Sequence, residues 1–377
     1  MSARVLVVCG TRPEAIKLAP VVRALTADAR FTPLVAVTAQ HRELLDQALG
    51  LFRIRPDYDL DLMRPDQDLY HVTSETLLGM RGVLADAAPD LVVVQGDTTT
   101  TFATALSCFY EHIPVAHVEA GLRSGDPFSP FPEEQNRVLT SRLAAHHFAP
   151  TERAREHLLH EGVPAAAIHV TGNTVVDALL EIAATVRESA PPLPEELATL
   201  DPSRRLVLVT AHRRESFGRG MRDVCLAVSE LARRHPALDL VFPVHPNPNV
   251  RVPAARVLGD RSNVRLVAPV DYAQLVWLMT RAHLVLTDSG GIQEEVASLS
   301  VPALVLRETT ERPEGVEAGG LRLVGTSKTR IVEETEKLLA DPELHARMTA
   351  APNPFGDGRA SERIRDILAR ELVREAA

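Results

Sequence analysis

The sequence predicts an α/β protein made of two Rossmann-like domains, each a doubly wound parallel sheet. Short runs of Val, Leu and Ile alternate with stretches whose apolar residues recur at helical spacing, which is typical of β-α-β units. One proline-rich interruption, at 188–194, lies near the middle of the 377 residues, and the alternation begins again after it. We therefore expect the same architecture twice, with the two domains facing a central cleft.

The first half of the chain offers candidate strands with helical patterns between them. The first helical pattern covers 13–25, where Ile16, Ala19 and Val22 share one face. Pro13 suits the first turn of this helix. The candidate strands are the apolar runs at 5–8, 34–38, 91–94, 113–118, 146–149 and 168–171.

The second half repeats this alternation. A helix is expected over 272–281, and the last segment, 361–377, contains an amphipathic helix that we expect to pack back on the first domain. We place the N-terminal domain at 1–172 and the C-terminal domain at 173–360. The candidate strands of the second domain are 206–210, 240–244, 264–267, 284–287, 303–306 and 321–324.

Composition excludes several classes of protein. The net charge of −9 argues against nucleic acid or an anionic membrane surface as a partner, because both require a basic surface. No apolar run approaches the ~20 residues of a membrane span, and the first run, 5–8, lacks the flanks of a signal peptide. We expect a cytoplasmic protein. Cys9, Cys108 and Cys225 lie apart in apolar runs, which favours small core residues over disulfides or a zinc site.

Carboxylates follow the candidate strands of the first domain at their C-terminal ends. Asp97 follows the strand at 91–94, and Glu119 follows the strand at 113–118. Ligands of open α/β sheets bind at this edge, and two carboxylates there suggest proton transfer on a bound small molecule. Glu133 begins a later helix and supplies a third acidic position near the same edge.

Structural alternatives are open for each of these residues. Asp97 could cap the helix that follows it, because a carboxylate there accepts backbone N–H groups. Glu133 could simply complement the dipole of its helix. Arg12, at a strand tip, is expected to bind phosphate or to position an acid, and Lys17 could do the same or lie on an exposed helix face. Three acidic positions near one crevice favour a site over these alternatives.

The second domain carries a candidate phosphate site. Ser289, Gly290 and Gly291 open a helix directly after a strand, and the backbone N–H groups of such a turn suit a diphosphate. A Gly-Gly pair also occurs where elements merely pack closely. Glu295 is placed to accept hydrogen bonds from ribose hydroxyls. His212, flanked by arginines at another strand tip, suits contact with phosphate or uracil or acid–base chemistry, with a structural histidine as the alternative.

Several kinds of site are disfavoured. The turn after the first strand has the single glycine Gly10, where a dinucleotide fingerprint needs three, so no nicotinamide cofactor is expected. The Gly-x-Ser-x-Gly nucleophile elbow is absent, which disfavours a serine hydrolase. His212 and His245 lie on separate strands without an acidic ligand set, so no metal site is expected.

A set of ordered motifs spans nearly the whole chain. They are Gly10-Thr11-Arg12-Pro13-Glu14-Ala15-Ile16-Lys17, Thr38-Ala39-Gln40-His41-Arg42-Glu43, Gly96-Asp97-Thr98, His117-Val118-Glu119-Ala120-Gly121-Leu122-Arg123, Pro132-Glu133-Glu134, His212-Arg213-Arg214-Glu215, Thr287-Asp288-Ser289-Gly290-Gly291-Ile292-Gln293-Glu294-Glu295, Thr310-Glu311-Arg312-Pro313-Glu314 and Asn353-Pro354-Phe355-Gly356-Asp357-Gly358. In these motifs the chain resembles the bacterial non-hydrolysing UDP-N-acetylglucosamine 2-epimerases. The resemblance implies two Rossmann-like domains in the GT-B arrangement, a homodimer and no cofactor.

The implied reaction inverts C2 of the sugar and interconverts UDP-GlcNAc and UDP-ManNAc. In the family, UDP leaves by anti elimination to give a 2-acetamidoglucal and then adds back by syn addition. The positions that match the family's catalytic residues are Asp97, Glu119, Glu133 and His212. The positions that match its UDP-sugar site are Arg12, Lys17, Asp97, Glu119, His212, Val270, Leu275, Ser289, Gly290, Gly291, Glu295 and Arg312.

The sequence departs from the family pattern at two places. Val270 and Leu275 replace the Gln and Phe that often surround the uracil, so apolar and backbone contacts are expected there. Many bacterial members bind a second UDP-GlcNAc as an activator, and the positions matching that site are Gln40, Glu43, Arg213 and His245. Glu43 and Asp66 stand where some members have Gln and Arg, and their charge is expected to weaken an anionic activator.

Other functions compete with this reading of the chain. The nearest is a 2-epimerase that acts on a modified UDP-sugar of the diacetamido uronic acid type. A GT-B glycosyltransferase would need a separate acceptor, and a hydrolysing epimerase would release free ManNAc. A sugar-nucleotide binding module would not need three aligned carboxylates.

Overall fold

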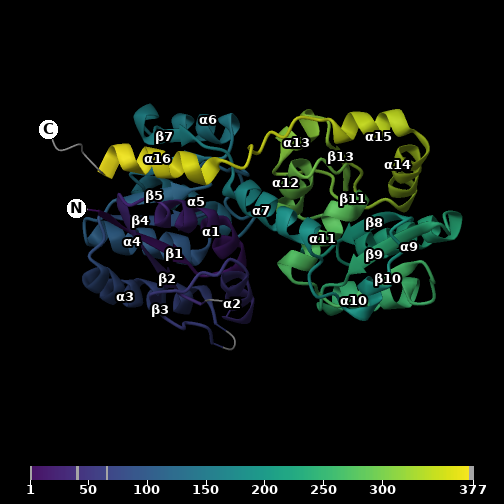
Figure 1. Ribbon diagram of the computed structural model, residues 1–377, viewed down its shortest axis with the longest axis horizontal. Helices are drawn as coiled ribbons and strands as arrows, with labels where there is room; N and C mark the ends of the chain where they lie inside the picture. Colours follow the sequence, from purple (N-terminus) through teal and green to yellow (C-terminus); the bar gives the residue numbers. More distant parts are fainter. Residues whose placement is uncertain (1, 40–41, 65–66, 373–377) are drawn as a thin grey trace. The chain divides into compact units, whose positions relative to one another are not determined.

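The structure, a computed structural model, describes residues 2–39, 42–64 and 67–372. These residues form two compact units (Figure 1). Unit 1 contains the chain up to Ala178 and again from Gly356, and unit 2 contains Leu179–Phe355. In the described residues no helix combines the length and the apolar composition that crossing a bilayer would demand.

Unit 1 is built on a 7-stranded parallel sheet of order β3-β2-β1-β4-β5-β6-β7. β1 pairs with β2 on one side and with β4 on the other, so the strand order reverses at β1, where doubly wound folds bind their ligands. The strands are β1 (Ala3–Cys9), β2 (Phe31–Val37), β3 (Tyr58–Asp59), β4 (Leu91–Gln95), β5 (Val115–Val118), β6 (His146–Ala149) and β7 (Ile168–Val170).

Helices connect these strands, as parallel pairing requires. Every residue of β4 is buried, as a continuous apolar run in a central parallel strand predicts. Its Val92 and Val94 pack with Leu6 and Val8 of β1 and with Met80 of α3 in one core cluster. The helices of unit 1 are α1 (Arg12–Thr26), α2 (Arg42–Leu51), α3 (Leu69–Ala87), α4 (Thr99–Tyr110), α5 (Glu133–Leu143), α6 (Glu152–His160) and α16 (Ala360–Leu372), with a 3-10 turn, η1 (Ala165–Ala167). The helix α7 (Thr174–Glu188) begins in unit 1 and continues into unit 2.

Unit 2 repeats this topology on a 6-stranded parallel sheet of order β10-β9-β8-β11-β12-β13. Its strands are β8 (Arg205–Thr210), β9 (Leu238–Pro243), β10 (Val264–Val267), β11 (Ala282–Thr287), β12 (Ala303–Val305) and β13 (Leu321–Leu323). Its helices are α8 (Glu195–Ala198), α9 (Arg219–Arg234), α10 (Pro248–Leu258), α11 (Tyr272–Arg281), α12 (Gly290–Ser298), α13 (Pro313–Glu317), α14 (Lys328–Ala340) and α15 (Pro342–Thr349), with η2 (Arg214–Ser216).

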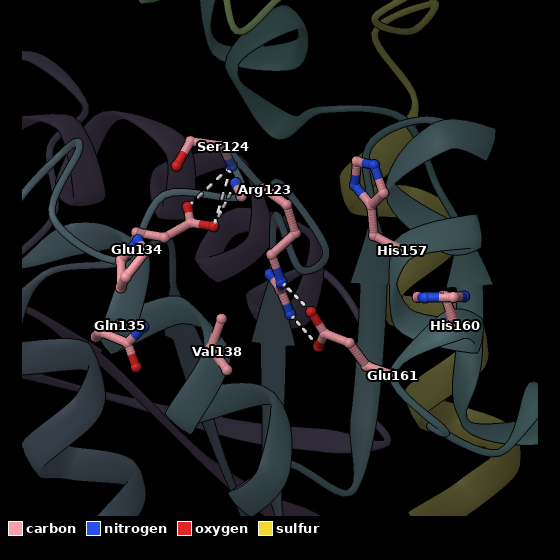
Figure 2. Close-up of a pocket in the computed structure, with 10 residues that line it drawn as sticks. Arg123, Ser124, Glu134, Gln135, Val138, His157, His160 and Glu161 are labelled. Carbon is pink, nitrogen blue, oxygen red and sulfur yellow. Dashed lines mark hydrogen bonds and ion pairs between the residues drawn. The ribbon is translucent and has the colours of Figure 1, made fainter.

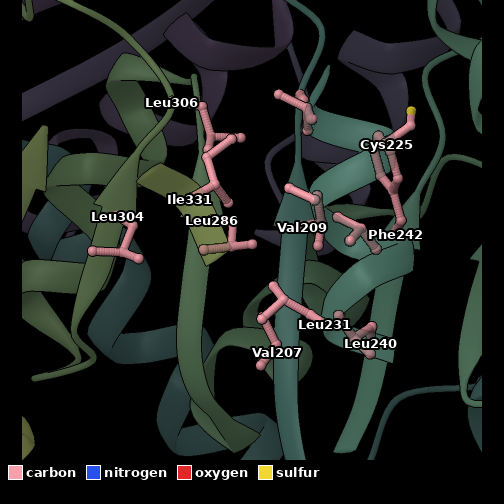
Figure 3. Packing of buried hydrophobic residues seen from close by; sticks show 14 of the residues in the cluster. Val207, Val209, Cys225, Leu231, Leu240, Phe242, Leu286, Leu304, Leu306 and Ile331 are labelled. Atoms are coloured by element: carbon pink, nitrogen blue, oxygen red, sulfur yellow. The ribbon is translucent and has the colours of Figure 1, made fainter. Parts of the chain in front are cut away.

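The core of unit 2 lies between this sheet and the helices on one of its faces (Figure 3). Val207 and Val209 of β8 alternate with residues of the other face and meet Phe242 of β9 and Leu286 of β11. Leu231 of α9 closes the layer from the helix side. These strands are therefore held rigidly, and so are the loops that follow their C-terminal ends.

The last helix of the chain, α16, belongs to unit 1. Figure 1 draws it in yellow, and it packs against α1. Ile364 and Leu368 are fully buried. At its start, Oδ1 of Asp177 accepts hydrogen bonds from Ser361 N (2.8 Å) and Oγ (2.6 Å), while Oδ2 accepts one from Ala360 N (3.2 Å). Burial raises the pKa of Asp177, and these donors oppose the rise.

The predicted fold class, two doubly wound parallel-sheet domains, is confirmed. The strand β3 was not predicted, because its two residues lie at the sheet edge and carry no apolar run. The boundary between the units falls inside α7, after Ala178, whereas we expected residue 172. α7 ends at Glu188, and the proline-rich segment after it is held by a hydrogen bond from Gln274 Nε2 to Pro192 O (2.7 Å).

Candidate active site

Glu119 accepts hydrogen bonds from three side chains of unit 1. It follows β5 with φ of 62°, in the left-handed region that non-glycine residues seldom adopt. Lys17 Nζ donates to Oε1 at 2.7 Å and to Oε2 at 2.6 Å. Asn173 Nδ2 donates to Oε1 at 3.1 Å, and Gln95 Nε2 donates to Oε2. A buried carboxylate with a cation and two amide donors is held in one orientation.

Asp97 follows β4 and faces the helix α5. Its Oδ2 lies 2.7 Å from Arg137 Nη2, and its backbone oxygen accepts a hydrogen bond from Asn136 Nδ2 (3.0 Å). Desolvation raises the pKa of Asp97, the Arg137 cation opposes the rise, and the charges of Glu119 and Glu133 add to it. These mutual effects place the three predicted acids in one electrostatic cluster.

Two adjacent glutamates at the start of α5 have different surroundings. Glu134 accepts hydrogen bonds from the backbone N–H groups of Ser124 (3.0 and 3.1 Å) and Gly125 (3.1 Å). Glu133 has a buried Oε2 with no hydrogen-bond partner among the described residues. Glu134 therefore fixes a loop, whereas Glu133 keeps an acceptor available for a ligand.

A cavity of about 460 Å³ lies behind this loop (Figure 2). Arg123 lines it and forms a bidentate pair with Glu161, from Nε to Oε1 at 2.6 Å and from Nη2 to Oε2 at 2.8 Å. Its other contacts are Leu122 O (2.7 Å) and Ser141 Oγ (3.1 Å). Figure 2 shows the guanidinium between Glu161 and the loop that Glu134 holds. These contacts hold Arg123, and with it the start of the loop that leads to α5, against α6 and its C-terminal end.

Glu14 ties the loop after β1 to the start of α4. It is fully buried and accepts hydrogen bonds from Gly10 N (3.1 Å) and Thr11 Oγ1 (2.7 Å) on its own side. Thr98 Oγ1 (2.8 Å) and Thr101 Oγ1 (3.0 Å) donate to its other oxygen. Burial raises the pKa of Glu14, and these donors oppose the rise. The side chain that caps α4 is Thr98, so the capping alternative for Asp97 is wrong.

In unit 2, the predicted phosphate site is organised by Asp288 at the end of β11. This carboxylate is fully buried and accepts hydrogen bonds from His212 N (2.8 and 3.1 Å) and Arg213 N (2.8 Å). The imidazole of His212 stacks on His245, with ring centroids 5.7 Å apart. Desolvation lowers the pKa of His212, and nearby Asp288 acts in the opposite direction. The loop after β8 is therefore fixed to the end of β11.

Cationic side chains surround the start of α12. Ser289 is its N-cap residue but its side chain makes no capping bond. A Cβ on Gly290 would lie 3.6 Å from Arg213 Nη2, 3.8 Å from Glu311 Oε2 and 3.9 Å from Arg312 Cζ, so two guanidinium groups and one carboxylate lie beside this turn. Arg312 pairs with Glu294 through Nε. The arrangement combines bare helix N–H groups with two cations, which suits a phosphate group.

The remaining predicted residues have simpler surroundings. Glu295 accepts a hydrogen bond from Tyr272 OH (3.0 Å). Arg12, Val270 and Leu275 are half-buried, and Gly291 is exposed. Of the predicted activator residues, Glu43 and His245 are exposed, while Arg213 lies beside Gly290. Gln40 and Asp66 lie outside the described residues.

Three residues that hold the carboxylates, Gln95, Arg137 and Asn173, were not among the predicted site residues. Arg137 lies one helical turn after Glu133 on α5, a spacing that a search for partners of Asp97 could have used. Gln95 is the last residue of β4, and Asn173 follows β7, so both lie at strand C-terminal ends like the acids. Within the described part of the chain, no group of three or more His, Cys, Asp or Glu side chains could hold a metal ion.

Several known proteins are similar to this chain in sequence and in fold. A family model for UDP-N-acetylglucosamine 2-epimerase matches residues 23–369. The UDP-N-acetylglucosamine 2-epimerase of Escherichia coli strain K12 is 55% identical over 374 residues, 98% of this chain and 99% of the relative. That of Neisseria meningitidis serogroup A is 47% identical over 367 residues, 97% of this chain and 99% of the relative.

Solved structures agree with this assignment. The UDP-GlcNAc 2-epimerase of Neisseria meningitidis bound to UDP-GlcNAc superposes with a TM-score of 0.91 at 46% identity, over 97% of this chain and 100% of that one. The Methanocaldococcus jannaschii enzyme in complex with UDP-GlcNAc and UDP gives a TM-score of 0.81 at 34% identity, over 97% and 99% of the two chains. With its carboxylate cluster, its cationic helix start and relatives of this identity along its whole length, the chain belongs to the UDP-N-acetylglucosamine 2-epimerase family.

Proposed function

We propose that this protein interconverts UDP-GlcNAc and UDP-ManNAc by eliminating UDP and adding it back. The observation that carries the proposal is the cluster of Asp97, Glu119 and Glu133, with Lys17 and Arg137 as its counter-charges. Proton removal from C2 needs a base, which a carboxylate can supply, and a second carboxylate nearby stabilises the positive charge that builds at C1 during C–O cleavage. The membership of the family supports the same reaction.

In this mechanism the UDP is held by the residues of unit 2 that the family pattern assigns to it. The turn at Ser289, Gly290 and Gly291 and the guanidinium of Arg312 receive the diphosphate and stabilise it as it leaves. His212 contacts the diphosphate or moves a proton near it, and desolvation lowers the pKa of its imidazole. Glu295, Val270 and Leu275 hold the nucleoside.

The glucal intermediate and UDP must not escape before re-addition. Syn addition then returns the diphosphate to C1 and delivers a proton to C2 on the same face of the glucal. This face of C2 is opposite to the one from which the proton was removed. Because the carboxylates interact, the proton transfers belong to the group of Asp97, Glu119 and Glu133 and not to one assigned acid. The product is proposed to serve as a precursor of bacterial cell-surface polysaccharide in the cytoplasm.

We further propose that the protein is a homodimer. The helices α3 and α4 pack together and expose large apolar side chains, among them Tyr70, Leu78, Phe109 and Tyr110. Exposed aromatic side chains on adjacent helices are typical of protein interfaces. Light scattering at micromolar concentration tests this, and Phe109→Asp should shift the mass from dimer to monomer.

One experiment tests the reaction and separates its rivals. The protein is incubated with UDP-GlcNAc in deuterated water and followed by NMR. UDP-ManNAc carrying deuterium at C2 is expected, because the C2 proton exchanges with solvent during elimination and re-addition. Free ManNAc would indicate a hydrolysing epimerase. No turnover without an acceptor would indicate a glycosyltransferase, and turnover only of a diacetamido uronic acid nucleotide would indicate the modified-sugar epimerase.

A second UDP-GlcNAc as activator is tested by the same assay. The exposed acid Glu43 replaces a neutral residue at the position that matches the activator site, so we expect hyperbolic dependence of the rate on UDP-GlcNAc. A sigmoidal dependence that becomes steeper in Glu43→Gln would show that the activator binds and that Glu43 weakens it.

A further inference from the structure

The hydrogen bonds of Asn173 include two that point in different directions. Its Nδ2 donates to Oε1 of Glu119 at 3.1 Å, and its Oδ1 accepts from Val175 N at 3.1 Å. The side chain is buried, so neither bond is replaced by water when it is lost. One face of this amide therefore orients a catalytic carboxylate while the other binds a free N–H at the start of α7.

The place of Asn173 in the chain is unusual. α7 begins at Thr174, and the chain passes from unit 1 to unit 2 within this helix, after Ala178. The chain re-enters unit 1 at Gly356, where a Cβ would lie 3.4 Å from both Asn173 N and Gly172 Cα. The points where the chain leaves and re-enters unit 1 therefore lie close to Asn173.

The other groups around Glu119 leave Asn173 a distinct task. Lys17 reaches both carboxylate oxygens and supplies charge. Gln95 donates from the end of β4, inside the rigid sheet. Asn173 donates from the position directly before α7, the helix that leads out of the unit, so it is the one of these three donors whose position depends on that helix.

We propose that Asn173 is a positioning residue for Glu119, whose amide couples the orientation of the catalytic carboxylate to the start of α7. The inference rests on the proposed function for its kinetic consequence. It predicts that loss of the amide donor misorients Glu119 while the substrate still binds, because the nucleotide is held by residues of unit 2.

The competing explanation is that Asn173 serves only as a helix cap. The two roles predict opposite effects of Asn173→Asp. Aspartate caps a helix as well as asparagine does, so a pure cap would keep its activity. For a positioning residue, this change replaces a donor with a second carboxylate beside Glu119, and like charges at this distance repel. Asn173→Ser keeps a capping oxygen, adds no charge and removes the amide donor, and the serine O–H ends one bond nearer the backbone.

The experiment compares the kinetics and melting temperatures of the wild-type protein, N173S and N173D. We expect kcat to fall about 10- to 100-fold in N173S and further in N173D, with KM changed less than about threefold, because small misplacements of a reacting group cost about this much. The matched control is Asp341→Asn, a cap exchange at the start of α15 that leaves the kinetics unchanged. A kcat within twofold of wild type in N173S and N173D would overturn the proposal.

A double-mutant cycle with Gln95→Met gives a readout that a merely structural role would not move. Both amides hold the same carboxylate, so the effects of N173S and Q95M on kcat are expected to be non-additive. Additive effects on kcat would contradict the shared role.

The failure of this inference is distinguishable from failure of the proposed function. If the wild-type protein does not epimerise UDP-GlcNAc, the function is wrong, and crystal structures of the wild type and N173S still decide the inference. A productive geometry tolerates a displacement of about 0.5 Å. We expect the Glu119 carboxylate of N173S to lie farther than this from its position in the wild type. An unmoved carboxylate in N173S would overturn it.

Discussion

Lys17 Nζ lies 2.7 Å from Oε1 and 2.6 Å from Oε2 of Glu119, so one ammonium group bridges both oxygens of the carboxylate. The side chains are only 14% and 4% exposed. Each charge therefore depends on the other for compensation, since water reaches neither freely. This pair joins the first helix of the chain to the end of β5, and it has measurable consequences for stability.

Lys17→Met is expected to lower the free energy of unfolding by about 3 kcal/mol, because it leaves the Glu119 carboxylate buried without its cation. Lys17→Met combined with Glu119→Gln should recover most of this loss, since the double variant buries no unpaired charge. Urea unfolding of the two single variants and the double variant measures the difference. Equal stability of Lys17→Met and wild type would show that the amides of Gln95 and Asn173 suffice.

Arg137→Gln is expected to move the acidic limb of the kcat/KM profile to higher pH. Arg137 lowers the pKa of Asp97, against the raising effects of desolvation and of the neighbouring acids. Without the cation, the carboxylate of Asp97 takes up its proton at a higher pH, so less of the ionised form remains below neutrality. Arg137→Lys keeps a cation and should retain a profile closer to that of the wild type. Identical limbs in Arg137→Gln and the wild type would contradict the prediction.

Asp288→Asn is expected to weaken UDP binding about 10- to 100-fold. The buried carboxylate accepts the N–H groups of His212 and Arg213, and an amide in its place would offer one acceptor fewer. The loop after β8 would then lose its attachment to the end of β11. Isothermal titration with UDP measures the affinity, with Asp341→Asn as the control for an Asp-to-Asn exchange in the same unit. A change of less than twofold would show that this attachment is dispensable.

Buried histidines on neighbouring strands predict how stability depends on pH. Burial lowers the pKa of His117 to about 3 and that of His147 to about 4. In the unfolded chain both histidines have a pKa of about 6.5. Below that pH the unfolded state therefore binds protons that the folded state does not. The free energy of unfolding should fall as the pH drops from about 6.5 toward 4, by up to about 1.4 kcal/mol per pH unit for each histidine. Stability is retained above pH 6.5.

Urea unfolding between pH 7 and pH 5 measures this slope. His147→Gln is expected to be less stable at pH 7 but to show a shallower loss on acidification, because the variant has one buried histidine fewer. A slope equal to that of the wild type would mean that His147 does not contribute.

Leu368→Ala is expected to destabilise unit 1 by about 2–5 kcal/mol, since Leu368 is fully buried on α16. Arg370→Ala, on the exposed side of the same helix, should change stability by less than about 0.5 kcal/mol. Amide hydrogen exchange distinguishes the units: protection should fall in β1 and β4 and stay unchanged in β8 and β11. A loss of protection in both units alike would contradict the assignment of α16 to unit 1.

The positions of the two acids at strand ends could be predicted because they depend on a local rule. Asp97 and Glu119 directly follow apolar runs that form central parallel strands, and the ends of such strands meet at one edge. The partners of these acids could not be predicted in the same way. Arg137 and Asn173 reach them from positions 40 and 54 residues away along the chain, and only the packed fold brings them together.

The alternatives for single residues were settled by local geometry. Whether Asp97 or Thr98 caps α4 depends on the backbone conformation of one residue, which the sequence does not determine. The position of Lys17 in the helical pattern is compatible with an exposed face. In the structure its side chain instead forms an ion pair with Glu119, whose carboxylate is buried. The neighbouring roles of Glu133 and Glu134 differ for a similar reason, since only Glu134 meets the N–H groups of the loop.

The return of α16 to unit 1 reverses the order in which the two units can be completed during synthesis on the ribosome. Unit 2 is one continuous stretch and has all its residues once Phe355 has emerged, whereas unit 1 must wait for the helix that starts at Ala360. Until then Asp177 lacks the donors of Ser361 and Ala360, and the apolar surface that Leu368 covers stays open to water or to a chaperone. The half of the protein that is translated first is therefore the half that finishes folding last.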